Sequence, residues 1–103
     1  MIIKFAFEYG SDFSCIWGVN KDSVDKFGGY LIEHEWLGIS KELDLKMQEL
    51  CVEFQSSLNW DYPPDPSPWT EEHWLDFKKR ARQAYDDLVK ELGDEYKVIY
   101  GVI

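Results

Sequence analysis

Residues 40–68 read SKELDLKMQELCVEFQSSLNWDYPPDPSP, and they set the architecture because a clear helical period is followed by an abrupt stop. Ser40 stands before the periodic part and can cap a helix through its hydroxyl group. Apolar side chains then recur at spacings of three and four residues: Leu43, Met47, Leu50, Cys51, Phe54 and Leu58. The pattern predicts an amphipathic helix from about Lys41 to Leu58.

The next ten residues, Asn59 to Pro68, contain all four prolines of the chain. Proline lacks a backbone donor and restricts the residue before it, so this segment predicts a stiff loop. Thr70 can cap a second helix, with Glu71 and Glu72 in the first turn where carboxylates complement the helix dipole. Gly93 would end this helix, which we expect over residues 71–92. Its apolar stripe consists of Trp74, Phe77, Ala81, Tyr85, Leu88 and Leu92.

Both ends of the chain alternate with the period of two that is typical of strands. The N-terminal segment predicts a hairpin with a turn at residues 10–12. Its alternating residues are Ile3, Phe5, Phe7 and Tyr9, followed by Phe13, Cys15, Trp17 and Val19. At the other end, Tyr96, Val98, Tyr100 and Val102 repeat the pattern. Both faces of this C-terminal strand are partly apolar, so we expect it inside the sheet, beside the hairpin.

The order of these elements predicts an α+β fold. Between the hairpin and the first long helix, Val24 and Phe27 could anchor one helical turn, and residues 30–33 could form a short extended piece. We therefore expect a single domain over residues 1–103, with an antiparallel sheet of three to four strands, formed by the N-terminal hairpin and the C-terminal strand. The two amphipathic helices should pack on one face of that sheet.

The chain is acidic, with 20 Asp and Glu against 11 Lys and Arg and a formal net charge of -9. Nucleic acid and anionic membranes are disfavoured as partners, because proteins that bind them normally present basic surfaces. A cationic protein is the natural complement. The charge could also serve only to keep a small protein soluble.

Several features indicate a cytoplasmic protein. No apolar run approaches the length needed to span a bilayer, and the N-terminal segment lacks the long apolar core of a signal peptide. Cys15 and Cys51 have apolar neighbours, as small buried hydrophobic residues do, and we expect both to be reduced thiols.

The sequence contains no recognisable catalytic, cofactor-binding or metal-binding motif. His34 and His73 each lack a second strong ligand at one helical turn, and we expect exposed side chains for both. A nucleophilic pair between His34 and either Cys15 or Cys51 would need a proximity that their spacing does not show. We therefore predict a binding protein rather than an enzyme, with no cofactor and no metal.

Residues 59–77 form the most negative segment, with five acids and no Lys or Arg. The segment also carries Trp60, Tyr62, Trp69 and Trp74. Aromatic anchors ringed by acids suit a surface that binds a basic protein. The alternative is that these aromatic side chains fold back into the core. The predicted partner-binding residues are Glu33, Glu35, Trp60, Asp61, Tyr62, Asp65, Trp69, Glu71 and Glu72.

Three segments also carry a family resemblance: FGGYLIEHEWLGISKEL (27–43), SSLNWDYPPDPSPW (56–69) and YDDLVKELGDEYKVIY (85–100). In this order they resemble small bacterial immunity proteins of polymorphic toxin and contact-dependent growth inhibition loci. The resemblance implies a protein that binds a cognate toxin domain and neutralises it by occluding its active or substrate-binding surface. It transfers no catalytic residues.

A basic nuclease is the toxin class that suits the charge of the chain, because nucleases need cationic surfaces. We expect a monomer that forms a heterodimeric complex with this toxin. Two other functions stay open: an acidic adaptor or regulatory module with no toxin partner, and a small enzyme or ligand-binding domain. A toxin-bearing reading frame immediately upstream would favour the immunity function over the adaptor.

Overall fold

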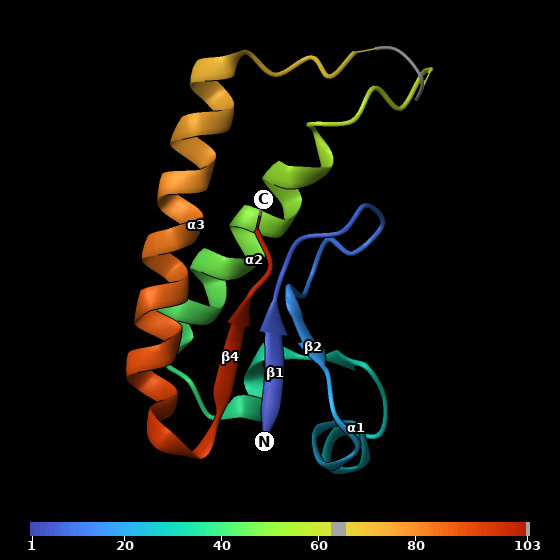
Figure 1. Cartoon of the computed structure of the whole chain (residues 1–103). Coiled ribbons are helices and arrows are strands. Elements are labelled where there is room, and N and C mark those ends of the chain that lie inside the picture. Colours follow the sequence, from blue (N-terminus) through green and yellow to red (C-terminus); the bar gives the residue numbers. More distant parts are fainter. Residues whose placement is uncertain (63–65, 103) are drawn as a thin grey trace.

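A computed structural model describes residues 1–62 and 66–102 and has the predicted α+β class. The elements are β1 (Ile2–Phe5), β2 (Ile16–Gly18), α1 (Lys21–Phe27), β3 (Leu31–Ile32), the 3-10 turn η1 (His34–Leu37), α2 (Lys41–Gln55), α3 (Glu71–Leu92), the 3-10 turn η2 (Gly93–Glu95) and β4 (Lys97–Tyr100). Figure 1 shows the two long helices running in opposite directions beside the sheet.

The sheet is mixed, so the prediction of a purely antiparallel sheet is wrong. The strand order is β3-β2-β1-β4. Strand β1 pairs antiparallel with β2, placing Ile3 opposite Gly18, and parallel with β4, placing Ile3 opposite Val98. A parallel neighbour requires a long crossover connection. The pair α2 and α3 is that crossover, because it returns the chain to the end of the sheet where β1 begins (Figure 1).

Strand β4 lies at the edge of the sheet rather than inside it. Helix α3 protects this edge, because the Tyr85 hydroxyl donates a 2.9 Å hydrogen bond to the Val98 carbonyl. The ring of Tyr100 lies 4.8 Å from that of Tyr85 and 4.9 Å from the Arg82 guanidinium carbon. An open strand edge is a template for pairing with other chains, and side chains that cover it reduce this hazard.

The hairpin is shorter than predicted, and its second strand presents the other set of side chains to the core. Ile16 is fully buried, whereas Phe13 and Val19 are 43% and 45% exposed. Cys15, which belongs to the predicted inward set, is also fully buried, so residues 14–16 are buried in succession and the exchange of faces begins at Ile16. The buried Ser14 hydroxyl donates to the Ile32 carbonyl and accepts from the Ile16 amide.

Helix α1 is longer than the single turn predicted from Val24 and Phe27. The Asn20 side chain accepts a hydrogen bond from the Ser23 amide, and the Ser23 hydroxyl accepts one from the Asn20 amide. Such a reciprocal capping box normally uses Glu or Gln at its second position, so the sequence pattern hid it. Gly28 ends the helix in the left-handed conformation, with φ of 75°.

The two long helices agree closely with prediction. Helix α3 spans the expected residues, and α2 ends at Gln55, three residues before the expected end at Leu58. Ser40 accepts from the Leu43 amide and Thr70 from the His73 amide, which are the predicted caps.

The core lies between these helices and one face of the sheet. Phe5 of β1 contacts Tyr85 of α3 and Tyr100 of β4, with ring centroids 5.9 Å and 6.2 Å away. The buried apolar side chains of the sheet are Ile3, Phe5, Ile16 and Ile32. Those of the helices are Leu43, Met47, Leu50, Cys51, Phe77, Ala81, Ala84 and Leu88. The predicted apolar stripes of both helices therefore face the core.

A group of charged residues also joins α2 to α3. The two carboxylate oxygens of Glu53 accept from Arg80 at 2.8 Å and 2.5 Å, and one of them lies 3.1 Å from His73 Nε2. Hydrogen bonds from Arg80, with a further contribution from His73, hold the pKa of Glu53 below its ordinary value. Because bidentate Arg–carboxylate pairs have a defined geometry, this contact fixes the relative register of the two helices.

Glu53→Gln is expected to lower the free energy of unfolding by about 1–2 kcal/mol near pH 7, the range for hydrogen bonds to charged groups that are partly exposed. The pKa of Glu53 is lowered in the folded state, so this stabilisation is complete above the ordinary carboxyl pKa and is lost as the pH falls through the folded value. Glu49→Gln is the matched control, because Glu49 is exposed on the same helix. Urea titrations at pH 7 and pH 3.5 should show a larger difference between the two variants at pH 7 than at pH 3.5.

Candidate functional site

An aromatic surface covers the end of the molecule where α2 stops and α3 begins. Tyr9 stacks on Phe54 with ring centroids 4.7 Å apart and meets Trp60 edge-on at 6.1 Å. The ring of Phe7 also stacks on Phe54, with the two centroids 5.6 Å apart. The loop after β1, the end of α2 and the segment after it therefore converge here. We call Phe7, Tyr9, Phe54, Trp60 and Trp74 the aromatic surface.

Hydrogen bonds from the end of α2 hold the β1–β2 loop in place. The Gln55 side chain accepts from the Gly10 amide at 2.8 Å and donates to the carbonyls of Glu8 and Ser11, both at 3.1 Å. The Tyr9 hydroxyl lies 2.8 Å from Ser57 Oγ. A surface fixed before binding loses less conformational entropy when a partner docks.

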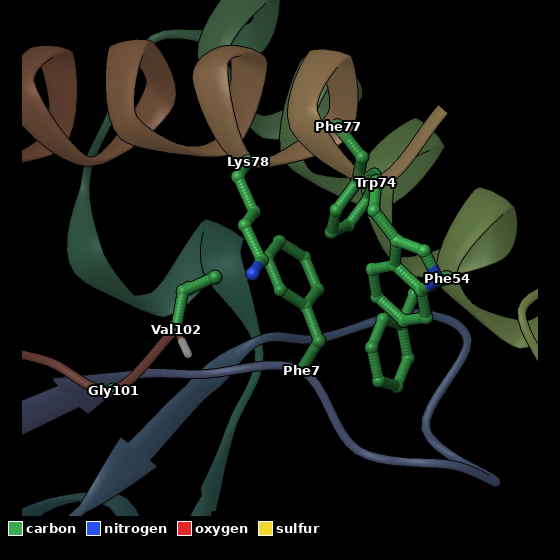
Figure 2. A pocket seen from close by; sticks show the side chains of 7 residues that line it. All are labelled: Phe7, Phe54, Trp74, Phe77, Lys78, Gly101 and Val102. Carbon is green, nitrogen blue, oxygen red and sulfur yellow. The ribbon is translucent and has the colours of Figure 1, made fainter. Parts of the chain in front are cut away.

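A pocket of about 240 Å³ opens beside the aromatic surface. Figure 2 shows the rings of Phe7, Phe54, Trp74 and Phe77 gathered around it, and the Lys78 side chain also borders it. The last described residues of the chain close the opposite side. The complete lining is Phe7, Phe54, Trp74, Phe77, Lys78, Gly101 and Val102.

Exposed carboxylates lie on the segments that build this end of the molecule. Glu8 and Asp12 belong to the β1–β2 loop, Asp61 follows Trp60, and Glu71 and Glu72 open α3. Within residues 1–62 and 66–102, none of these five carboxylates has an ion-pair partner within 4.0 Å. These five negative charges are therefore exposed to the solvent around the aromatic surface.

The structure divides the predicted aromatic residues into exposed and buried side chains. Trp60 and Tyr62 are 56% and 60% exposed, whereas Trp69 is buried. The Trp69 ring lies 4.6 Å from Trp74, and its Nε1 donates to Ser56 Oγ at 2.9 Å, so it supports the loop from inside. The predicted residue Asp65 lies outside the described residues. Tyr9, which the strand pattern had included, is an additional exposed aromatic residue at this site.

Glu33 and Glu35 lie far from the aromatic surface. Both precede α2, whereas Asp61 follows it, and a helix of 15 residues separates its ends by about 22 Å. Glu35 is exposed and Glu33 is half-buried. The two predicted groups of acids therefore occupy opposite ends of α2, and their joint role in binding stays a prediction.

His34 is 2% exposed, which corrects the expectation of an exposed side chain. Its Nε2 accepts from the Cys15 amide at 3.1 Å, and its Nδ1 lies 3.0 Å from Asp44 Oδ1. Because Nε2 accepts a hydrogen bond, it carries no hydrogen of its own, so Nδ1 carries the hydrogen of a neutral ring and donates a hydrogen bond to Asp44. Burial lowers the pKa of His34, which favours the same neutral form.

The contact between Cys15 and His34 has the features of a structural site. The thiol lies 3.7 Å from His34 Nε2, but that nitrogen already accepts the Cys15 amide. Burial raises the pKa of the Cys15 thiol well above its ordinary value, whereas nucleophilic cysteines need the thiolate. This geometry favours a role in joining the β1–β2 loop to η1 and α2.

Within residues 1–62 and 66–102, no three His, Cys, Asp or Glu side chains gather in a way that could hold a metal ion. Across the same residues, none of the helices combines the length and the apolar character required to cross a bilayer.

Comparison with known protein families gives a match that covers nearly the whole chain. The model of a family described as Serratia CdiI immunity protein-like matches residues 1–102. None of the curated proteins matches the sequence.

Proposed function

We propose, because this chain belongs to the Serratia CdiI immunity protein-like family, that it neutralises a basic nuclease toxin by covering the toxin's active or substrate-binding surface. Membership of this family supports a role as an immunity protein that binds a cognate toxin. The nuclease class and the interface are proposals of our own. The observation that carries them is the aromatic surface with five unpaired carboxylates around it.

The chemistry of this surface suits a nuclease. Nucleases bind a polyanion, so their active-site clefts are cationic, and an acidic inhibitor both approaches them faster and competes with nucleic acid. Exposed aromatic side chains such as Trp60 and Tyr62 are the residue types that dominate binding energy in protein interfaces. Affinity would come from the rings and rapid association from the carboxylates.

We further infer a one-to-one complex in a reducing compartment. Cys15 and Cys51 are both buried free thiols, which supports a cytoplasmic location because oxidising compartments favour disulfides. An acidic adaptor would show the same surface, so the partner must be identified directly. The candidate is the toxin domain encoded by the reading frame immediately upstream.

The decisive experiment mixes the purified protein with that upstream toxin domain. We expect a stable one-to-one complex by light scattering and loss of the toxin's degradation of nucleic acid at equimolar protein. A stable complex without inhibition would favour an adaptor. The absence of any complex would contradict the immunity function for this pair.

Charge reversal around the aromatic surface should slow association. The triple variant Glu8→Lys, Asp12→Lys and Asp61→Lys is expected to reduce the association rate constant about tenfold in low salt and to weaken its salt dependence, because exposed charges act mainly on the encounter. Thermal stability should change little, since all three side chains are exposed. Stopped-flow kinetics at two ionic strengths measures both effects.

The matched control reverses Asp22, Glu42 and Asp94, three exposed acids outside the predicted binding residues, which gives the same net charge away from the aromatic surface. We expect this control to retain most of the wild-type association rate. Equal losses in the two triple variants would show that only the total charge matters. A larger loss in the control would place the interface at the start of α2, where the predicted residues Glu33 and Glu35 also lie.

A further inference from the structure

We propose that the pocket beside Phe54 receives a single uncharged aromatic side chain of the toxin, and that this side chain anchors the complex. This inference rests on the proposed function and adds the chemistry of the contact. The pocket lies between α2, α3 and the last residues of the chain, as Figure 2 shows.

The size of the pocket selects the occupant. Sites for drug-sized ligands and cofactors commonly measure about 300–1,000 Å³, which exceeds the 240 Å³ found here. An apolar cavity of about 150 Å³ can hold a benzene molecule. The pocket is therefore large enough for one aromatic ring and its attached methylene group, but small for an independent ligand.

The lining selects an apolar and uncharged group. Phe7, Phe54, Trp74 and Phe77 supply four aromatic walls, and Val102 supplies an aliphatic one. Among the described residues that line the pocket, Lys78 is the single charged one. A basic toxin could also offer Lys or Arg, but the Lys78 ammonium would repel either cation. The same ammonium can interact favourably with the face of an inserted neutral ring.

The position of the pocket connects it to the surface that the toxin is proposed to cover. Phe54 lines the pocket and also stacks on Tyr9, whose ring meets Trp60. A shallow depression on the other side is lined by Glu71, Trp74, Leu75 and Lys78, and it shares Trp74 and Lys78 with the pocket. An anchor here would thus be surrounded by apolar contacts and then by acids, the arrangement seen around interface hot spots.

The test closes the pocket at its mouth. Lys78→Trp should raise the dissociation constant for the upstream toxin domain, measured by titration calorimetry, at least tenfold, mainly through faster dissociation. Lys79→Trp is the matched control, because Lys79 is the exposed neighbour on α3, is absent from the pocket lining and loses the same charge. We expect the control to bind within about threefold of the wild type.

A second pair approaches the pocket from the other side. Val102→Trp should weaken binding to a similar extent, whereas Val19→Trp adds the same bulk at an exposed site near α1. Unfolding midpoints would establish that each variant is folded before its affinity is compared.

The results separate this inference from the proposed function. If folded Lys78→Trp and Val102→Trp bind as tightly as their controls, the pocket is not an anchor site. This holds even when the charge-reversal variant with Glu8→Lys, Asp12→Lys and Asp61→Lys supports the toxin interface. If the wild-type protein forms no complex with the toxin domain, the proposed function and this inference are both overturned. Weaker binding by the two pocket variants alone supports the anchor.

Discussion

Leu88→Ala is expected to lower the free energy of unfolding by about 2–5 kcal/mol, the usual cost of emptying a buried leucine site. Leu88 is fully buried on the inner face of α3. The cost has two parts: the loss of apolar burial and the cavity that rigid neighbours cannot close. Leu50→Ala on α2 should fall in the same range, because Leu50 is 3% exposed.

The same helices provide matched controls for both substitutions. Leu75 on α3 and Leu45 on α2 are 60% and 49% exposed. All four variants make the same chemical change within a helix, so differences in helix propensity cancel. We expect Leu75→Ala and Leu45→Ala to change stability by about 0.5 kcal/mol or less. Urea midpoints that are equal within each pair would show that the helix faces have been assigned wrongly.

His34→Ala is expected to lower the free energy of unfolding by about 2–4 kcal/mol, because two polar groups lose their partner at a buried site. The Cys15 amide and the Asp44 carboxylate both bond to the His34 ring in the folded protein. Asp44 keeps a 2.8 Å hydrogen bond from Gln48, so the amide suffers the larger loss. His73→Ala is the comparison, and its half-exposed ring should make the cost smaller.

The His34 site should also make stability depend on pH in a defined direction. Burial lowers the pKa of His34 below its ordinary value of 6.5, so the unfolded chain binds this proton more readily than the folded protein. The contribution of His34 to the free energy of unfolding is therefore fully present above about pH 6.5, and it decreases as the pH falls towards the lower folded pKa. Asp44 and Cys15 are the titratable side chains that the structure places in contact with the ring.

Denaturant titrations between pH 5.5 and pH 8 measure this effect in a range above the titration of ordinary carboxyl groups. The wild-type protein should lose stability towards pH 5.5, and His34→Ala should show a smaller slope. Identical slopes would indicate that His34 titrates similarly in the folded and unfolded states. In that case burial would not disfavour the protonated ring in the folded protein.

Local patterns in the sequence were sufficient for the helical half of the molecule. Ser40 and Thr70 are the caps, and the stripes through Leu50 and Leu88 face the core, because helix periodicity and capping depend on residues only a few positions apart. The segments around the proline-rich loop also carried the resemblance to immunity proteins, which the family match over residues 1–102 confirms. Composition alone established the acidic charge.

Contacts between distant segments account for what the local patterns missed. The parallel pairing of β4 with β1 follows from the return path through α2 and α3, and alternation in a strand carries no information about direction. His34 is buried because Cys15 and Asp44 satisfy both ring nitrogens from other elements. Tyr9 and Trp60 meet through folding across about half the chain, whereas Glu33 and Asp61 are kept apart by a rigid helix. The candidate site is therefore a product of packing, since its residues share no period and become neighbours only when the core forms.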